Sequence, residues 1–261
     1  MKLDMYRISA FASQPFAGNP AAIIPLLDWL PDDLMQNIAR ENNLSETAFI
    51  VPLNDGEWHI RWFSPVIEVP LCGHATLAAA TVIDFKHQNL DWPISFMSAS
   101  GPLSVSKEEE LYVLDLPTQR PEVAAPSDNI KSALNISNME LWHGGNMYMA
   151  VLDQESEVDN INPDFEELKE CVPFGIAVTA PGNDCDFVSR FFAPSLGINE
   201  DPVTGSAHSV LTPYWIDRIG KNELKAKQIS SRGGEVICRY GGDRTYVGGK
   251  TTLFFSGVIR V

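Results

Sequence analysis

Short apolar runs separated by Gly, Pro, Asn and Asp residues make up most of the chain. Runs of this length, bounded by turn residues, are typical of strands. They recur from one end of the chain to the other, which predicts extensive sheet or barrel structure. The predicted strands are Met5–Ala10, Ala21–Ile24, Ala48–Val51, Trp58–Phe63, Leu103–Ser106, Leu111–Leu114, Met147–Leu152, Gly175–Thr179, Phe187–Phe192, Glu235–Tyr240, Thr245–Gly248 and Thr252–Val261.

Helical patterns are fewer. Pro31–Asn42 begins with Pro-Asp-Asp, residues that suit the first turn of a helix. Cys72–Phe85 is apolar almost throughout and rich in alanine, which predicts a helix buried on all sides. Ser206–Ile219 is a further predicted helix, and Asn162–Glu170 is predicted as a short surface helix.

The chain contains an internal duplication. Arg61–Pro65 and Arg190–Pro194 both read R-x-F-x-P. After a short loop, Glu68–Ala75 and Glu200–Ala207 both read E-x-P-x-x-G-x-A and lead into a helical pattern. Two ordered motifs, half a chain apart, indicate two similar halves rather than chance similarity in a chain rich in Gly and Pro.

Two like halves commonly pack so that equivalent loops meet in one cleft. We therefore predict an N-terminal half over residues 1–118 and a C-terminal half over 119–251, with the active site in the cleft between them and Pro121–Ser127 as a linker. In each half the G-x-A turn stands where a helix begins. The free N–H groups of a helix N-terminus bind anions, so these turns are suited to a small carboxylate-bearing substrate.

The charge balance excludes several classes of partner. The chain has 34 acidic and 19 basic residues, a net charge of −15, and no run of four Lys or Arg residues. This composition argues against binding of nucleic acid or of anionic membranes. Four widely spaced cysteines, with no C-x-x-C pair, indicate free thiols in a reducing compartment. Because no signal-peptide pattern or membrane-spanning apolar stretch is present, the cytoplasm is the expected location.

Glu46 is a candidate acid–base residue. It stands between a predicted helix and a predicted strand, within Asn43–Phe49, where short polar residues give way to an apolar run. A carboxylate partly buried in a cleft has a raised pKa and can carry protons near neutral pH. From the local sequence alone, a helix-capping residue or a solvated loop charge remains an equally open interpretation.

Other candidates lie at the duplicated turns. His74 follows Gly73 and can carry a proton or serve as a hydrogen-bonded structural imidazole. Asp201 can orient such a group or begin a helix, and Ser206 can contact substrate or cap one. A symmetric two-thiol racemase is excluded, because the position that matches Cys72 in the second half is Thr204, so Cys72 is interpreted as a packing residue.

Cofactor signatures are missing from the sequence. The five histidines form neither an H-x-x-x-H nor an H-E-x-x-H pattern, which gives no support for a metal site. There is no phosphate-binding loop, no dinucleotide fingerprint and no G-x-S-x-G motif. We therefore expect a mechanism without metal or organic cofactor.

Several of these segments together resemble the phenazine-biosynthesis PhzF-like family of the diaminopimelate-epimerase-like superfamily. The matching segments are Phe16–Ala22, Leu44–Phe49, Glu68–Leu77 and Glu200–Ala207, in family order. The resemblance implies an α+β fold of two pseudo-symmetric domains, each a β-barrel-like sheet around a central helix. It also implies that the last strand, residues 252–261, can return to the first domain.

The resemblance implies chemistry as well. The family glutamate, which moves a proton between substrate carbons, matches Glu46, and the supporting residues match His74, Asp201 and Ser206. The resemblance thus favours a cofactor-independent isomerase, a homodimer, that acts on a small anionic carboxylate substrate. The predicted substrate-binding residues are Asn19, Gly73, Ala75, Thr204 and Gly205.

Two alternatives stay open at this point. The chain can be a catalytically silent member of the fold that binds a small molecule or a protein. It can also be a lyase or hydrolase that uses the same acid–base residues, because proton abstraction next to a carbonyl precedes many outcomes. The substrate, its stereochemistry and the pathway are not readable from the sequence.

Overall fold

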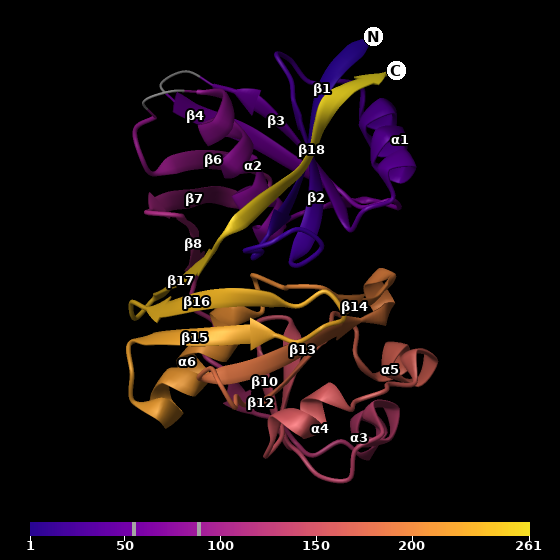
Figure 1. Cartoon of the computed structure of the whole chain (residues 1–261). Helices are drawn as coiled ribbons and strands as arrows, with labels where there is room; N and C mark the ends of the chain where they lie inside the picture. The colour runs from indigo at the N-terminus through magenta and orange to yellow at the C-terminus, as the bar shows by residue number, and fades with distance from the viewer. Residues whose placement is uncertain (54–55, 88–89) are drawn as a thin grey trace. The chain divides into compact units, whose positions relative to one another are not determined.

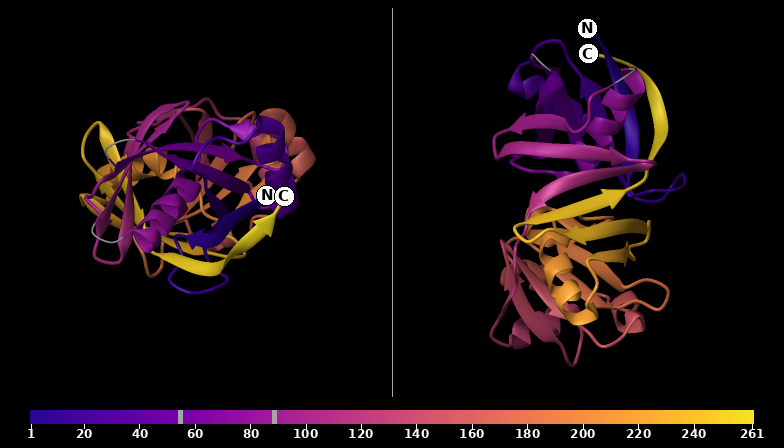
Figure 2. Two further views of the ribbon diagram at one scale, coloured as in Figure 1. Left: turned by 90° about the horizontal axis from the view of Figure 1, so that it is seen from above. Right: turned by 90° about the vertical axis from the view of Figure 1, so that its left-hand side faces the viewer.

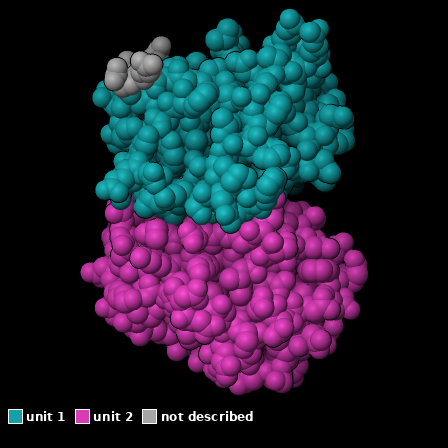
Figure 3. Space-filling model, viewed as in Figure 1, with its two compact units in different colours: residues 1–115, 248–261 teal, residues 116–247 magenta. Residues whose placement is uncertain are grey.

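The chain divides into two compact units in the computed structural model, which describes residues 1–53, 56–87 and 90–261 (Figure 1). Unit 1 comprises Met1–Asp115 and Gly248–Val261, and unit 2 comprises Leu116–Val247 (Figure 3). The segment 121–127, suggested as a linker by its prolines, lies inside unit 2, where Glu122 and Val123 pair with a neighbouring strand. None of the helices among the described residues is long and apolar enough to cross a membrane.

Unit 1 is built from strands with two helices. The strands are β1 (Lys2–Ala10), β2 (Asn19–Pro25), β3 (Glu46–Pro52), β4 (Glu57–Phe63), β5 (Glu68–Val69), β6 (Ile94–Ser98), β7 (Gly101–Glu108), β8 (Leu111–Pro117) and β18 (Thr251–Arg260). The helices are α1 (Asp32–Asn42) and α2 (Gly73–Lys86). β1 pairs with β2 and β18, β2 runs parallel to β3, and β4 pairs with β3, β5 and β6. β18 is therefore part of unit 1, although it is the last strand in the chain.

The two helices of unit 1 differ because their sequences differ. α1 buries Met35, Ile38 and Ala39, a spacing that places one apolar stripe against the sheet. α2 is buried along most of its length, from Gly73 to Ile83, and contacts β1, β2, β3, β7 and β18. It is the central helix of the unit, with strands around it (Figure 2). Its alanine-rich sequence suits this place, since small side chains let strands approach from every side.

Unit 2 contains more helical segments. Its strands are β9 (Glu122–Val123), β10 (Glu140–Gly144), β11 (Met147–Val151), β12 (Ile176–Pro181), β13 (Phe187–Ala193), β14 (Ile198–Asp201), β15 (Glu223–Gln228), β16 (Gly234–Tyr240) and β17 (Arg244–Gly249), which leads back into unit 1. Its helices are α3 (Asp128–Leu134), α4 (Glu155–Asp159), α5 (Phe165–Cys171), the short 3-10 helix η2 (Pro194–Leu196) and α6 (His208–Ile219).

The units repeat one pattern of strand pairing. In unit 1 the successive pairs β1–β2, β2–β3, β3–β4 and β4–β6 are antiparallel, parallel, antiparallel and parallel. In unit 2 the pairs β10–β11, β11–β12, β12–β13 and β13–β15 follow the same order. α2 and α6 stand at equivalent places, before β6 and β15. The duplication predicted from the two sequence motifs is therefore present in the topology.

The repeated motif also forms the same ion pair in each unit. Arg61 binds both oxygens of Glu68 at 2.7 Å. Arg190 binds both oxygens of Glu200 at 2.7 and 2.9 Å. Such two-pronged pairs are geometrically specific. In both units the pair ties the strand of the R-x-F-x-P motif to the loop that leads into the G-x-A turn.

Candidate active site

The first group of candidate residues lies at one end of unit 1. Asn19 begins β2 and Glu46 begins β3, and these strands run parallel with Ala21 opposite Glu46. His74 lies in the first turn of α2, and Cys72 immediately precedes that helix. Because α2 packs against both strands, the four side chains come together although they stand far apart in the sequence.

His74 is the centre of this group. Its Nε2 lies 3.2 Å from Glu46 Oε2, and its Nδ1 lies 3.2 Å from Asn19 Nδ2 and 3.4 Å from Cys72 Sγ. An amide nitrogen only donates, so Nδ1 accepts from Asn19. The neutral ring then carries its proton on Nε2, the nitrogen that lies 3.2 Å from Glu46 Oε2. Asn19 thus determines which ring nitrogen carries the proton.

Burial keeps this imidazole uncharged. His74 is buried, and desolvation lowers its pKa to about 3, because the charged ring would lose its hydration. At neutral pH the contact with Glu46 therefore joins a neutral imidazole and a carboxyl group, and is not a full ion pair. Glu46 is also buried, with 11% of its side chain exposed. A buried carboxylate beside a neutral N–H donor is equipped to accept and return a proton.

The backbone of the same turn adds positive potential. The first hydrogen bond within α2 runs from Thr76 N–H to Cys72 O at 3.2 Å. The N–H groups of Gly73, His74 and Ala75 precede it and point out of the helix end, where they attract negative charge. Gly73 and Ala75 are both buried, so these N–H groups lie in a weakly hydrated environment.

A second group lies at the equivalent turn of unit 2. Thr204 Oγ1 donates to Asp201 Oδ2 at 2.5 Å. Gln228, from β15, holds both residues: its Oε1 accepts from the Thr204 N–H at 2.8 Å, and its Nε2 donates to the Asp201 carbonyl at 2.7 Å. All three residues are buried. Thr204 thus bonds to the Asp201 carboxylate, while Gln228 holds the backbone of both residues.

α6 begins later than its sequence pattern predicts. The pattern starts at Ser206, whereas the helix starts at His208. The reason is a tight turn over Thr204–Ala207, in which Ala207 N–H bonds to Thr204 O and His208 N–H bonds to Gly205 O. Gly205 is buried inside this turn, and Ser206 is exposed on it.

A family model described as "Phenazine biosynthesis-like protein" matches residues 8–257. The chain belongs to this family. An uncharacterized isomerase of Pseudomonas aeruginosa is 46% identical over the full length of both chains. The crystal structure of a phenazine biosynthesis protein PhzF family member from Enterococcus faecalis has a TM-score of 0.96 and 45% identity, again over both chains entirely.

The fold extends to more distant proteins. A probable proline racemase from Agrobacterium radiobacter superposes with a TM-score of 0.66 at 11% identity, covering 99% of this chain and 92% of the racemase. At this identity the likeness concerns the fold alone. It agrees with the predicted α+β fold of the diaminopimelate-epimerase-like type, two like domains of sheet and central helix.

The predicted site residues of this chain lie in two places. Asn19, Glu46, Gly73, His74 and Ala75 lie together in unit 1. The remaining predicted residues lie at one turn of unit 2: Asp201, Thr204, Gly205 and Ser206.

Two residues of these groups were not predicted. Cys72, interpreted from the sequence as a packing residue, is buried with its Sγ 3.4 Å from His74 Nδ1, in a group of three possible metal ligands with His74 and Glu46. The signal for it is its place before the glycine of the turn. Gln228 lies in a strand far along the chain, and nothing in its local sequence marks it.

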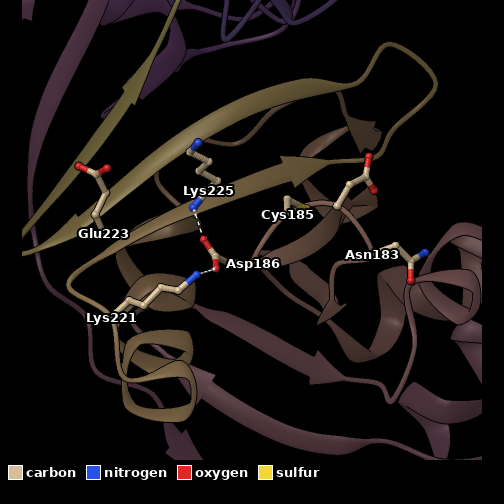
Figure 4. Close-up of a pocket in the computed structure, with 7 residues that line it drawn as sticks. Asn183, Cys185, Asp186, Lys221, Glu223 and Lys225 are labelled. Carbon is tan, nitrogen blue, oxygen red and sulfur yellow. Dashed lines mark hydrogen bonds and ion pairs between the residues drawn. The ribbon is translucent and has the colours of Figure 1, made fainter.

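A separate hollow on unit 2 contains none of these residues. Figure 4 shows it between the 183–186 loop and the start of β15. Asp186 accepts hydrogen bonds from Lys221 Nζ and from the Lys225 N–H, and Asp184 pairs with Lys227 at 2.9 Å. These charges neutralise one another in pairs, so we assign the hollow no function.

Proposed function

We propose that this protein is an isomerase that moves a proton on a small carboxylate-bearing substrate, with Glu46 as the proton carrier. The observation that supports it best is the buried Glu46 carboxyl group, whose Oε2 lies 3.2 Å from Nε2 of the neutral His74 ring. Relatives that match over their whole length are named isomerases, which agrees with this reaction class. The proposed transfer needs no metal or organic cofactor.

The proposed reaction has two steps. The Glu46 carboxylate takes a proton from a substrate carbon, so the C–H bond breaks, an O–H bond forms on Glu46, and the electron pair delocalises into the adjacent unsaturated system. Glu46 then returns the proton to a different carbon, and the double bond shifts. In this proposal the His74 Nε2–H stabilises the Glu46 carboxylate while Glu46 is charged. This interaction weakens once Glu46 is protonated.

The helix ends supply the binding contribution in this proposal. The N–H groups at Gly73–Ala75 bind negative charge on the substrate and stabilise the charge that develops during proton removal. The turn of unit 2 has N–H groups at Gly205 and Ser206 that are suited to a carboxylate in the same way. Asp201, whose carboxylate accepts from Thr204, is the acid–base residue of that turn. Removal of a group that binds the substrate is expected to raise KM, whereas removal of the Glu46 carboxylate is expected to lower kcat.

Hydrogen exchange tests the role of Glu46. The protein is incubated in deuterated water with a panel of small unsaturated carboxylates, and deuterium uptake at substrate carbon is followed by NMR. We expect at least one compound to exchange with wild type, and Glu46→Gln to lower that exchange at least 100-fold, because the amide cannot accept the proton. Glu57→Gln, an exposed carboxylate of the same unit, is the matched control and should exchange as wild type does.

Other outcomes select the alternatives. Unchanged exchange by Glu46→Gln, with circular dichroism showing a folded protein, refutes the role of Glu46. Tight binding of a panel compound without any exchange in wild type indicates a binding protein rather than an enzyme. A product of changed mass indicates a lyase or hydrolase, because isomerisation leaves the mass of the substrate unaltered.

A further inference from the structure

Gln228 is a buried amide at the end of a strand. It is the last residue of β15, where its backbone pairs with Ser189 of β13 and with Gly234 of β16. The residue is 1% exposed. Burying an amide costs free energy unless hydrogen bonds replace those that it made to water. The partners of this side chain therefore explain why a glutamine stands here.

These partners fix the orientation of the amide. Gln228 Oε1 accepts from the Thr204 N–H at 2.8 Å, and Nε2 donates to the Asp201 carbonyl at 2.7 Å. A backbone N–H only donates and a carbonyl only accepts, so an amide rotated by half a turn would lose both hydrogen bonds. The amide therefore has one orientation, with Nε2 on the side of the Asp201 carbonyl.

The amide nitrogen also directs the Thr204 hydroxyl. Gln228 Nε2 lies 3.3 Å from Thr204 Oγ1, and because an amide nitrogen only donates, Oγ1 is the acceptor there. A hydroxyl has one proton to donate, and that of Thr204 goes to Asp201 Oδ2 at 2.5 Å. The hydrogen bonds thus run in one direction, from the amide to the hydroxyl and from the hydroxyl to the carboxylate. Connected hydrogen bonds of this kind strengthen one another.

The backbone of Thr204 is held at both ends as well. Its N–H donates to Gln228 Oε1, and its carbonyl accepts from His208 Nδ1 at 2.9 Å and from the Ala207 N–H at 3.2 Å. These bonds leave the Thr204 backbone little freedom. The hydroxyl of Thr204 therefore defines one position for the carboxylate oxygen that it binds.

Unit 1 repeats the fold without these three polar groups. The residues that match Asp201, Thr204 and Gln228 in the first copy are Val69, Cys72 and Ser98. Val69 has no polar side-chain atom, and the Ser98 hydroxyl donates to a carbonyl of its own hairpin at 2.8 Å. The repeated fold therefore does not require the three side chains. Their presence together in unit 2 points to a role in the chemistry of that unit.

We propose that Gln228 is a positioning residue that acts through the Thr204 hydroxyl and holds the Asp201 carboxylate in place for proton transfer. This inference rests on the proposed function, in which Asp201 is the acid–base residue of the turn. Gln228 itself carries no proton between groups, because an amide is neither an acid nor a base near neutral pH. Its contribution is orientation, and a displacement of about 1 Å can lower a rate roughly 100-fold.

Paired substitutions test this role in the hydrogen-exchange assay. Thr204→Val keeps the shape of the side chain and removes its hydroxyl, and Gln228→Met removes the amide. We expect each to lower kcat at least about tenfold, with KM within about twofold of wild type. Thr204→Ser keeps a hydroxyl and should stay within about threefold of wild type in kcat. Thr212→Val, which changes a buried threonine of α6, is the matched control and should exchange as wild type does.

A double variant shows whether Gln228 acts through Thr204. If it does, adding Gln228→Met to Thr204→Val causes no further loss, and kcat stays within about twofold of that of Thr204→Val. Losses that multiply would overturn the inference, because they would mean that the two residues act separately. An equal loss in Thr204→Ser would overturn it as well.

Carbon-13 NMR tests the same hydrogen bonds without turnover. The chemical shift of the Asp201 carboxyl carbon should change in Thr204→Val and in Gln228→Met, and should match wild type in Thr204→Ser and Thr212→Val. Circular dichroism shows whether each variant is folded. Gln228→Glu, which keeps the acceptor but loses the donor, repeats the test with a second side chain.

The outcomes separate this inference from the proposed function. An unchanged Asp201 shift in the folded Gln228 variants overturns the positioning role. Shifts that change as expected, without exchange of any panel compound by wild type, uphold the positioning of Asp201 and refute the isomerase. Exchange by wild type with unchanged shifts does the reverse.

Discussion

His208 is a buried histidine with a structural role. Its Nδ1 lies 2.9 Å from the Thr204 carbonyl, to which it donates, and the ring is inaccessible to solvent. Among the described residues, its Nε2 is buried without a hydrogen-bond partner. A second proton on this ring would be uncompensated, and burial lowers the pKa of His208 to about 4. The His208 ring is therefore neutral in the folded protein at neutral pH.

This shift makes stability depend on pH. The folded pKa of about 4 lies below the unfolded value of 6.5, so the stabilisation is complete above pH 6.5 and is lost as the pH falls toward 4. We expect His208 alone to remove about 2 kcal/mol of unfolding free energy between pH 7 and pH 5. Urea denaturation measures the unfolding free energy at each pH. The difference between the two values should be smaller by that amount in His208→Gln than in wild type.

His143→Gln is the matched control for this prediction. The His143 side chain is exposed in the folded chain, much as it is in the unfolded chain. Its replacement should leave the difference between the two pH values as in wild type. An unaltered difference in His208→Gln as well would contradict the assignment of the pH dependence to burial of His208.

The functional role of a residue can be predicted from the neighbouring sequence at some positions and not at others. Glu46 and His74 stand in recognisable segments, and the chemistry of each can be suggested from its neighbours. The 3.2 Å contact between them cannot be predicted from the sequence, because it depends on how α2 packs against β2 and β3. Gln228 could not be predicted for the same reason. It forms hydrogen bonds with Asp201 and Thr204, which come close to it only in the folded chain.

At the scale of elements, α1 and α2 illustrate how a helix sequence reports its surroundings. The apolar stripe of α1 and the uniformly apolar sequence of α2 predicted a one-sided and an enclosed helix, and the burial of each agrees. Each predicted boundary is within one residue of the observed one. α3 and α4 were not predicted, since helices of seven and five residues carry too little periodicity to be recognised.

The enclosed position of α2 predicts sensitivity to added volume. Ala79 is fully buried, so Ala79→Leu must displace surrounding side chains or strands. We expect a loss of about 1–3 kcal/mol of unfolding free energy. Glu41→Leu introduces the same side chain on the exposed face of α1 and should change stability by about 0.5 kcal/mol or less. Equal losses in the two variants would show that α2 has space around it. Chemical denaturation measures both.

At the scale of the whole molecule, the duplication preserves topology but not energetics. The Arg–Glu pair of unit 1 is more exposed: 25% of the Arg61 side chain is accessible, against 13% for Arg190. Arg190 also donates to three backbone carbonyls, at Val158, Asp159 and Ile161. One arginine of unit 2 thereby fastens the α4 region to β13 through backbone carbonyls, whereas Arg61 reaches α1 through an ion pair with the exposed Asp32 side chain at 2.8 Å.

The two arginines are therefore expected to differ when removed. Arg190→Met leaves Glu200 and three carbonyls without their donor, and should cost about 3 kcal/mol of unfolding free energy. Arg61→Met removes a more solvated pair and should cost about 1 kcal/mol or less. Thermal and urea denaturation of both variants provide the comparison. A larger loss from Arg61→Met would contradict the view that the copies have diverged in this way.

The division of the chain into two like units could be predicted in part from the sequence. The repeated motifs predicted two like units, because their spacing survives in two copies of one strand order. Between β11 and β12, α4 and α5 stand where α1 stands between β2 and β3, and of these two only α5 was predicted, as Asn162–Glu170. α4 has five residues, too few for a helical period to be recognised in the sequence.

The membership of β18 in unit 1 bears on how the protein is made. β1 pairs with β18 along its length, from Lys2 with Arg260 to Ala10 with Thr251. During synthesis the residues of unit 2 are all available before this partner strand leaves the ribosome. The unit whose residues emerge first is thus completed only when β18 has been synthesised, and until then the β1 edge of its sheet stays unpaired.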